Sequence, residues 1–172
     1  MYNNLLMVGN FPSSTGYAWN MIGSCFNELG SDFIENGNRS IVCYPKVDVI
    51  PEYLKDDRIE LVEFDFDKAS FIDLIRFLRK NKIKIVYLID KKAFSLKYAF
   101  LRMSGVRNIV VHDHTSGQRT QPEGIRRAIK KLANRLSIVS ADVILTISEY
   151  VKRRQVEVSC VPSKKVITVL NG

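Results

Sequence analysis

The sequence predicts an α/β domain built on a mainly parallel sheet with helices on both faces. Two patterns in the sequence carry this prediction, namely short apolar runs and the helical segments that separate them. Short apolar runs alternate along the 172 residues with segments whose apolar residues recur at helical spacing. Strands that are separated by helices form βαβ units, and the strands of such units are parallel. A flavodoxin-like single domain fits the same alternation and is the rival fold.

In the first half of the chain, strands are predicted at residues 5–8, 40–44, 59–64 and 83–89. Residues 9–16 and 51–58 are rich in turn-forming and charged residues and are predicted to be loops. A helix is predicted where apolar residues recur from Ala18 to Leu29, with Gly30 at its end. A second helix follows over residues 68–81, capped by Asp67 and ended by Asn81.

In the second half, a helix is predicted at residues 94–103, stopped by Gly105, and a strand at residues 108–111. The next helix carries an apolar stripe of Ile125, Ala128, Ile129, Leu132, Ala133 and Leu136. A strand at 143–147 then runs into Ser148, whose hydroxyl can cap a basic helix. A final strand is predicted from Val166.

Composition indicates one ordinary globular domain. Hydrophobic residues make up 46% and charged residues 26% of the chain. No window has the roughly 18 uncharged apolar residues of a membrane span, and the first residues lack the basic segment of a signal peptide. The three cysteines, Cys25, Cys43 and Cys160, lack metal-ligand spacing, so we expect free thiols in a reducing compartment. The expected location is therefore cytoplasmic.

The loop at residues 9–16 could bind a phosphate, because small residues let backbone N–H groups approach an anion. Ser14, Thr15 and Gly16 are its candidate binding residues. The loop has neither the Gly-x-Gly-x-x-Gly fingerprint of dinucleotide binding nor a Walker loop. A plain strand-to-helix turn is the alternative.

Both histidines of the chain lie in His112-Asp113-His114-Thr115, directly after a predicted buried strand. Ligands of open α/β sheets bind at the carboxyl ends of the strands, which favours a site here over a structural role. His112 and His114 lie on the same side if the strand continues that far, because side chains alternate along a strand. We expect His114 to share one cleft with residues 12–16 and Ser148.

Asp65-Phe66-Asp67 has the Asp-x-Asp pattern of a divalent-metal site. It precedes a predicted helix, which makes the capping role of Asp67 the favoured interpretation. No metal and no cofactor are predicted.

Positive charge is concentrated in the helix that follows the histidines. Its basic residues project away from the apolar stripe, with Arg126 and Lys130 nearest the edge of that stripe. A solvated face is one interpretation, and attraction to an anionic membrane is the other. A second basic group includes Lys91, Lys92, Lys97, Arg102 and Arg107, and no nucleic-acid motif accompanies either group. The candidate membrane-binding residues are Arg119, Arg126, Arg127, Lys130, Lys131 and Arg135.

The last thirty residues carry a family resemblance. They consist of a strand, the turn Thr146-Ile147-Ser148-Glu149, a basic helix, and a strand ending in Asn171-Gly172. This order resembles the end of the N-terminal domain of family 4 glycosyltransferases of the GT-B fold. The resemblance implies a Rossmann-like three-layer sandwich that forms one half of a GT-B enzyme. Residues 1–172 would be the acceptor-side domain, with the donor-binding domain absent and the isolated domain inactive.

By this resemblance, the complete enzyme is a retaining, metal-independent glycosyltransferase that moves a sugar from a nucleotide-sugar to a glycan or lipid-linked acceptor. In the family, a histidine after the equivalent strand contacts the donor, and His114 matches it, with His112 in reserve. The other candidate donor- or acceptor-binding residues are Ser14, Thr15, Gly16, Thr115, Ser148 and Glu149. A non-catalytic subunit that recruits a separate enzyme to the inner face of a membrane is the alternative, and a nucleic-acid-binding domain is a third.

Overall fold

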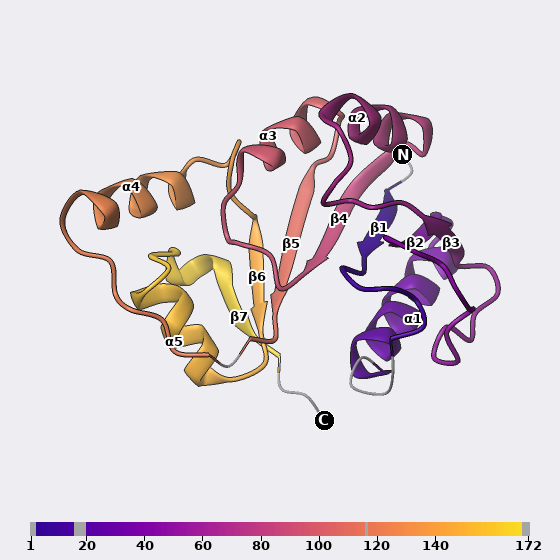
Figure 1. Ribbon diagram of the computed structural model, residues 1–172, viewed down its shortest axis with the longest axis horizontal. Helices are drawn as coiled ribbons and strands as arrows, with labels where there is room; N and C mark the ends of the chain where they lie inside the picture. Colours follow the sequence, from indigo (N-terminus) through magenta and orange to yellow (C-terminus); the bar gives the residue numbers. More distant parts are fainter. Residues whose placement is uncertain (1–2, 16–19, 116, 170–172) are drawn as a thin grey trace. The chain divides into compact units, whose positions relative to one another are not determined.

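The predicted α/β fold is confirmed by a computed structural model that describes residues 3–15, 20–115 and 117–169 (Figure 1). Strand order is β3-β2-β1-β4-β5-β6-β7, which contains the Rossmann order 3-2-1-4-5-6 and rules out the flavodoxin-like order 2-1-3-4-5. The elements are β1 (Asn4–Val8), α1 (Asn20–Glu35), β2 (Ser40–Tyr44), β3 (Glu60–Glu63), α2 (Phe71–Lys80), β4 (Ile83–Ile89), α3 (Leu96–Met103), β5 (Asn108–Asp113), α4 (Gly124–Arg135), β6 (Val143–Thr146), α5 (Glu149–Glu157), the 3-10 turn η2 (Ser163–Lys165) and β7 (Val166–Thr168).

The chain forms two compact units that share β4. The first comprises residues 1–87 and 104–107, and the second comprises residues 88–103 and 108–172. In the first, β1 pairs in parallel with β2, and β2 with β3. In the second, β5 pairs in parallel with β6, and β6 with β7. The strands β1 and β2 are buried along their whole length, as expected of parallel strands covered on both faces.

Helix α1 continues past Gly30 to Glu35, so the prediction that Gly30 ends the helix is wrong. Gly30 has a packing role instead, because an added Cβ would lie 2.6 Å from Cδ1 of Ile59. Gly37 lies in the turn directly after the helix and has a φ of +76°. There Gly37 N donates to Ile34 O and Asn38 N donates to Phe33 O, the bonds of a glycine C-cap.

The predicted cap of α2 is also wrong. Ser70, not Asp67, is the N-cap, and its hydroxyl accepts from Asp73 N at 3.1 Å. Asp65 accepts from the N–H groups of Asp67 and Lys68 and so stabilises the turn before the helix. Asn81 ends the helix, as predicted.

Helix α4 presents its apolar stripe outward. Ile125, Ile129 and Leu132 are 77%, 57% and 60% exposed, and Leu136 and Ile138 are also exposed. The side that is withdrawn from solvent is polar: Asn134 is buried, and its amide donates to Ser159 O at 2.7 Å. The apolar stripe therefore does not pack on the protein, and the basic residues are divided between the two sides of the helix.

Free thiols are confirmed among the described residues: Cys43 and Cys160 are buried and Cys25 is half-buried. No described helix combines the length and the apolar character needed to cross a bilayer.

Candidate functional site

The candidate site is built at the carboxyl end of β5. The strand runs two residues further than predicted, to Asp113, and so includes His112. The rings of His112 and His114 lie 4.0 Å apart between centroids, which places both histidines on the same side, as alternation predicts. Asp90 follows β4 and accepts from the backbone N–H of His114 at 2.7 Å. This bond fixes the backbone from which the His114 ring projects.

The two imidazoles are held in their neutral form. Burial, and then the neighbouring His114, lowers the pKa of His112 to about 4. Burial also lowers the pKa of His114, although Asp90 and Asp113 oppose that shift. The His114 side chain is 9% exposed, and its Nδ1 lies 3.8 Å from Asp90 Oδ1, beyond hydrogen-bond distance. Among the described residues, neither ring nitrogen of His114 has a hydrogen-bond partner.

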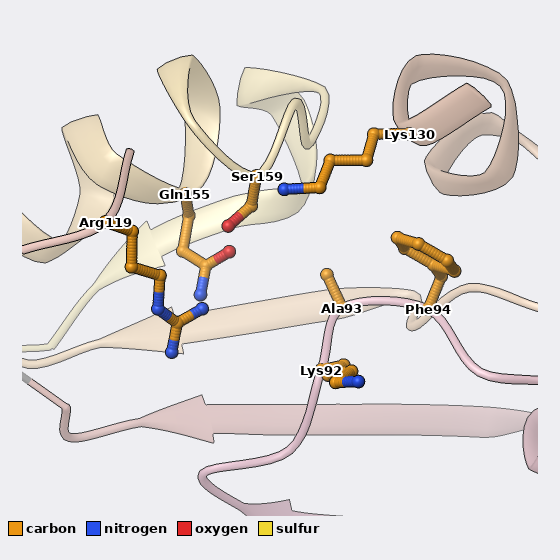
Figure 2. A pocket seen from close by; sticks show the side chains of 7 residues that line it. All are labelled: Lys92, Ala93, Phe94, Arg119, Lys130, Gln155 and Ser159. Atoms are coloured by element: carbon orange, nitrogen blue, oxygen red, sulfur yellow. The ribbon is translucent and has the colours of Figure 1, made fainter. Parts of the chain in front are cut away.

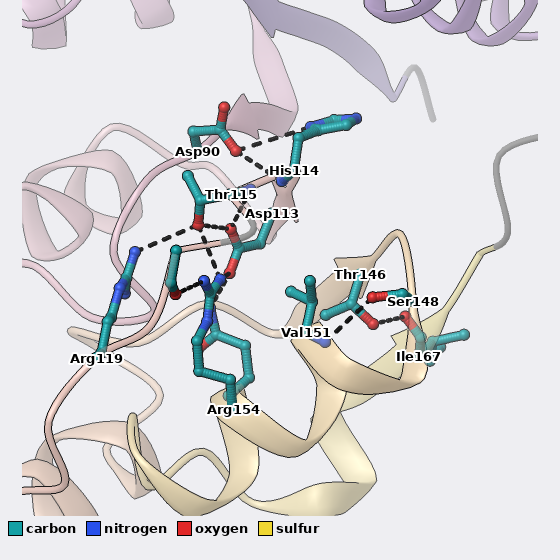
Figure 3. A network of polar contacts seen from close by, with 12 residues as sticks. Asp90, Asp113, His114, Thr115, Arg119, Thr146, Ser148, Val151, Arg154 and Ile167 are labelled. Carbon is teal, nitrogen blue, oxygen red and sulfur yellow. Dashed lines mark hydrogen bonds and ion pairs between the residues drawn. The ribbon is translucent and has the colours of Figure 1, made fainter.

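Asp113 lies between the two histidines in sequence and joins a separate buried network (Figure 3). Its Oδ2 accepts from Arg154 Nη2 at 2.6 Å and also from the Gln155 amide. Its Oδ1 accepts from the Thr115 backbone at 3.0 Å and from the Thr115 hydroxyl at 2.5 Å. Arg154 further donates to Gly117 O at 2.7 Å. The network ties the loop after β5 to helix α5.

This network keeps Asp113 ionised. Burial acts to raise the pKa of Asp113, but the donors from Thr115, Gln155 and Arg154 outweigh burial and lower it below its ordinary value. Both members of the Asp113–Arg154 pair are 3% exposed at the side chain. A buried pair with its partner atoms satisfied is costly to break, because the remaining charge is left without compensation.

The junction between β6 and α5 has the predicted cap. Ser148 accepts from Val151 N at 3.2 Å, and α5 begins at Glu149. Glu149 is exposed, and its carboxylate accepts from the Thr168 hydroxyl at 2.5 Å. A carboxylate in the first turn is stabilised by the helix dipole.

The loop after β1 belongs to the first unit. Ser14 is exposed and donates to Asp48 Oδ2 at 3.0 Å, and the Thr15 backbone donates to Pro12 O at 3.0 Å. Gly9 is required here for packing, because an added Cβ would lie 2.2 Å from the Tyr44 ring. Gly16 lies outside the described residues, so the expected cleft that joins this loop to His114 stays a prediction.

Beside the Asp113 network, a pocket of about 280 Å³ lies in the second unit (Figure 2). Four segments line it: the loop after β4, the loop after β5, α4 and the end of α5. Figure 2 shows Arg119, Gln155 and Ser159 on one side and Phe94 on the other. The lining residues are Lys92, Ala93, Phe94, Arg119, Lys130, Gln155 and Ser159. Of the candidate membrane-binding residues, Arg119 and Lys130 thus face this pocket.

Several polar residues of this region were not identified from the sequence as candidate site residues. Asp90, Arg154 and Gln155 were not candidates, although Arg154 and Gln155 share a helix face with buried Val151 and Val158. Arg154, Gln155 and Val158 lie three, four and seven residues after Val151, and this helical spacing could have indicated that Arg154 and Gln155 face inward. In the part of the chain that is described, no three His, Cys, Asp or Glu residues are arranged to hold a metal ion.

Comparison with known proteins identifies a family and a similar solved structure. The model of Glycosyltransferase Family 4 matches residues 25–172. A crystal structure of a glycosyltransferase from Rickettsia africae ESF-5 is similar, with a TM-score of 0.64 and 14% identity. That alignment covers 99% of this chain but only 43% of the Rickettsia chain, so this chain spans less than half the length of that protein. A search of curated proteins gave no match.

Proposed function

Because the chain belongs to glycosyltransferase family 4, we propose that it forms the N-terminal, acceptor-side domain of a retaining glycosyltransferase. The complete enzyme transfers a sugar from a nucleotide-sugar to an acceptor, and a second domain supplies most of the donor contacts. Departure of the nucleotide then needs positive groups or donors on the developing phosphate charge. These come mainly from that second domain, so residues 1–172 alone do not turn over.

The observation that carries this proposal is the state of His114. The side chain stands at the carboxyl end of β5, is nearly buried, and has two ring nitrogens with no hydrogen-bond partner among the described residues. A buried polar group in this condition costs free energy unless a ligand pairs with it. A neutral imidazole can donate from one nitrogen and accept at the other, which suits a sugar hydroxyl.

The test uses the complete protein with a panel of nucleotide-sugars, and product and released nucleotide are measured. His114→Ala should lower kcat/KM at least a hundred-fold, the usual scale for one directed polar contact to the reacting groups. A melting temperature measured beside the rate reports separately any loss of packing of the nearly buried ring against His112. Unchanged turnover in His114→Ala, or robust turnover by residues 1–172 alone, would refute the proposal.

We also propose that the protein binds a membrane surface, and the exposed apolar stripe of α4 favours this second proposal. Ile125, Ile129 and Leu132 lie along one side of the helix and are 57% to 77% exposed. Arg126, Lys131 and Arg135 are exposed beside them. An apolar side flanked by cations matches an anionic bilayer, which offers both acyl chains and negative headgroups. A protein partner would need an apolar surface surrounded by acidic residues to match the same stripe and its flanking cations.

Co-sedimentation with vesicles of phosphatidylcholine, with or without phosphatidylglycerol, tests this second proposal. Binding should increase with phosphatidylglycerol and decrease as salt screens the charges. Ile129→Gln should weaken binding at every salt concentration, since it removes apolar insertion and leaves the charge unchanged. Equal sedimentation of wild type and Ile129→Gln, or a salt-stable dimer that buries the stripe, would contradict it.

A further inference from the structure

The pocket between α4, α5 and the loops after β4 and β5 has an unbalanced charge. Lys92, Arg119 and Lys130 line it, and its described lining includes no carboxylate. None of the three forms an ion pair with a carboxylate among the described residues. In the described part of the chain, the Arg119 side chain has a 3.4 Å contact to the Thr115 hydroxyl, and the Lys130 side chain has a 3.5 Å contact to Val158 O. Three cations around one concavity favour an anionic ligand.

A second observation concerns Gln155, which is 3% exposed and lines the same pocket. Its Nε2 must face Asp113, because an ionised carboxylate only accepts hydrogen bonds. The amide orientation is thereby fixed, and Oε1 is left without a hydrogen-bond partner in the described structure. An acceptor of this kind is unfavourable beside the unprotonated oxygens of a phosphate. It requires a donor such as a hydroxyl group.

The remaining lining refines the chemistry. Ser159 adds a half-buried hydroxyl, which can donate or accept, and Phe94 adds an aromatic surface. A volume of about 280 Å³ lies just below the usual range for drug-sized ligands, so the occupant is small. The pocket therefore combines cations for an anion, an acceptor for a hydroxyl and an apolar ring face.

We propose that this pocket binds a phosphorylated sugar or polyol, with its phosphate among Lys92, Arg119 and Lys130 and a hydroxyl on Gln155 Oε1. The same chemistry occurs in a free sugar phosphate and in the headgroup of an inositol lipid. That the ligand is the acceptor of the transfer reaction rests on the proposed function, whereas the binding itself does not.

Calorimetry on residues 1–172 tests the binding with myo-inositol 1-phosphate, glucose 6-phosphate, inorganic phosphate and glucose. At least one of the two phosphorylated polyols should bind about ten-fold or more tightly than inorganic phosphate, and glucose alone should bind weakly. Lys92→Gln and Lys130→Gln should each weaken that binding about ten-fold, the scale of one charge-assisted hydrogen bond. Ser159→Ala should weaken it without changing the affinity for inorganic phosphate.

Lys164→Gln is the matched control, because Lys164 is exposed in the same unit and does not line the pocket. Its binding should equal that of wild type. Equal affinity for inorganic phosphate and both polyol phosphates, tighter binding of uridine monophosphate, or the same loss in Lys164→Gln would each overturn the proposal. The proposal would also be overturned if neither polyol phosphate bound at millimolar concentration.

A vesicle arm separates the two sources of the ligand. If the ligand is a lipid headgroup, myo-inositol 1-phosphate should displace the protein from phosphatidylinositol vesicles but not from phosphatidylglycerol vesicles. If the ligand is a free sugar phosphate, the soluble ligands should bind the protein but should displace it from neither kind of vesicle. If no binding is found but the complete enzyme turns over, the pocket proposal is rejected and the proposed function stands. If the polyol phosphate binds but the complete enzyme does not turn over, only the proposed function is rejected.

Discussion

Acidification should destabilise this protein through His112. The ring is 3% exposed at the end of β5, and burial together with the neighbouring His114 lowers its pKa from 6.5 to about 4. The folded protein therefore resists protonation that the unfolded chain accepts. Stability from this histidine is complete above the unfolded pKa and is lost as the pH falls from about 6.5 towards 4.

The magnitude follows from the width of that window. Each pH unit between the two pKa values changes the free energy of unfolding by up to about 1.4 kcal/mol. Going from pH 7 to pH 5 should therefore remove about 2 kcal/mol through His112 alone. The pKa of His114 is lowered too, which adds to the loss. Burial raises the pKa of Asp90, and protonation of that carboxyl in the folded state works in the opposite direction at the acidic end.

Urea unfolding followed by circular dichroism at pH 5, 6 and 7 measures this effect. The informative quantity is the slope of unfolding free energy with pH, since His112→Gln also removes packing and lowers stability at every pH. The variant cannot titrate at this position, so its loss between pH 7 and pH 5 should be about 2 kcal/mol smaller than that of wild type. Parallel curves for the two proteins would refute the assignment of the pH dependence to His112.

Three further outcomes are expected. Arg154→Met should lower the free energy of unfolding by about 3 to 5 kcal/mol, because Asp113 is left buried and unpaired, and the same urea assay measures it. Gly9→Ala should cost about 1 to 3 kcal/mol, because its Cβ would lie 2.2 Å from the buried Tyr44 ring. Leu132→Gln should change the melting temperature little, because that side chain is 60% exposed, while weakening vesicle binding. A large loss of stability in Leu132→Gln would mean that the stripe is packed.

The order and type of the elements could be predicted from the sequence because buried parallel strands are local apolar runs. The strand at 83–89 and the Ser148 cap are as predicted. The errors arise where a distant residue decides the outcome. Gly30 resembles a helix stop, yet its role is set by Ile59, which lies 29 positions later. Ser70 and Asp67 are both good caps, and only the path of the chain selects Ser70.

Helix α4 shows a second limit of sequence patterns. Periodicity gives the direction of the apolar stripe around the helix, but not the surface against which the helix packs. Asn134 determines which side of the helix faces the protein. Its side-chain amide donates hydrogen bonds to the backbone carbonyl groups of Lys130 and Ser159. Ser159 follows α5 and is 25 positions away, so no local pattern contains this contact.

Alternation along β5 explains how one strand end serves two separate chemical environments. His112 and His114 project to one side, where their rings lie 4.0 Å apart, and Asp113 between them projects to the other. There Asp113 holds the Gln155 amide in the only orientation that leaves Oε1 directed to a ligand. The charge of Asp113 is compensated by Arg154, so this orientation is kept without a net buried charge. Asp113→Asn should therefore have two effects. It should lower stability, because Arg154 is left buried without its carboxylate. In the protein that remains folded, the new amide could donate to Gln155, the Gln155 amide could turn, and selectivity for a polyol over inorganic phosphate should fall although no ligand contact has been removed.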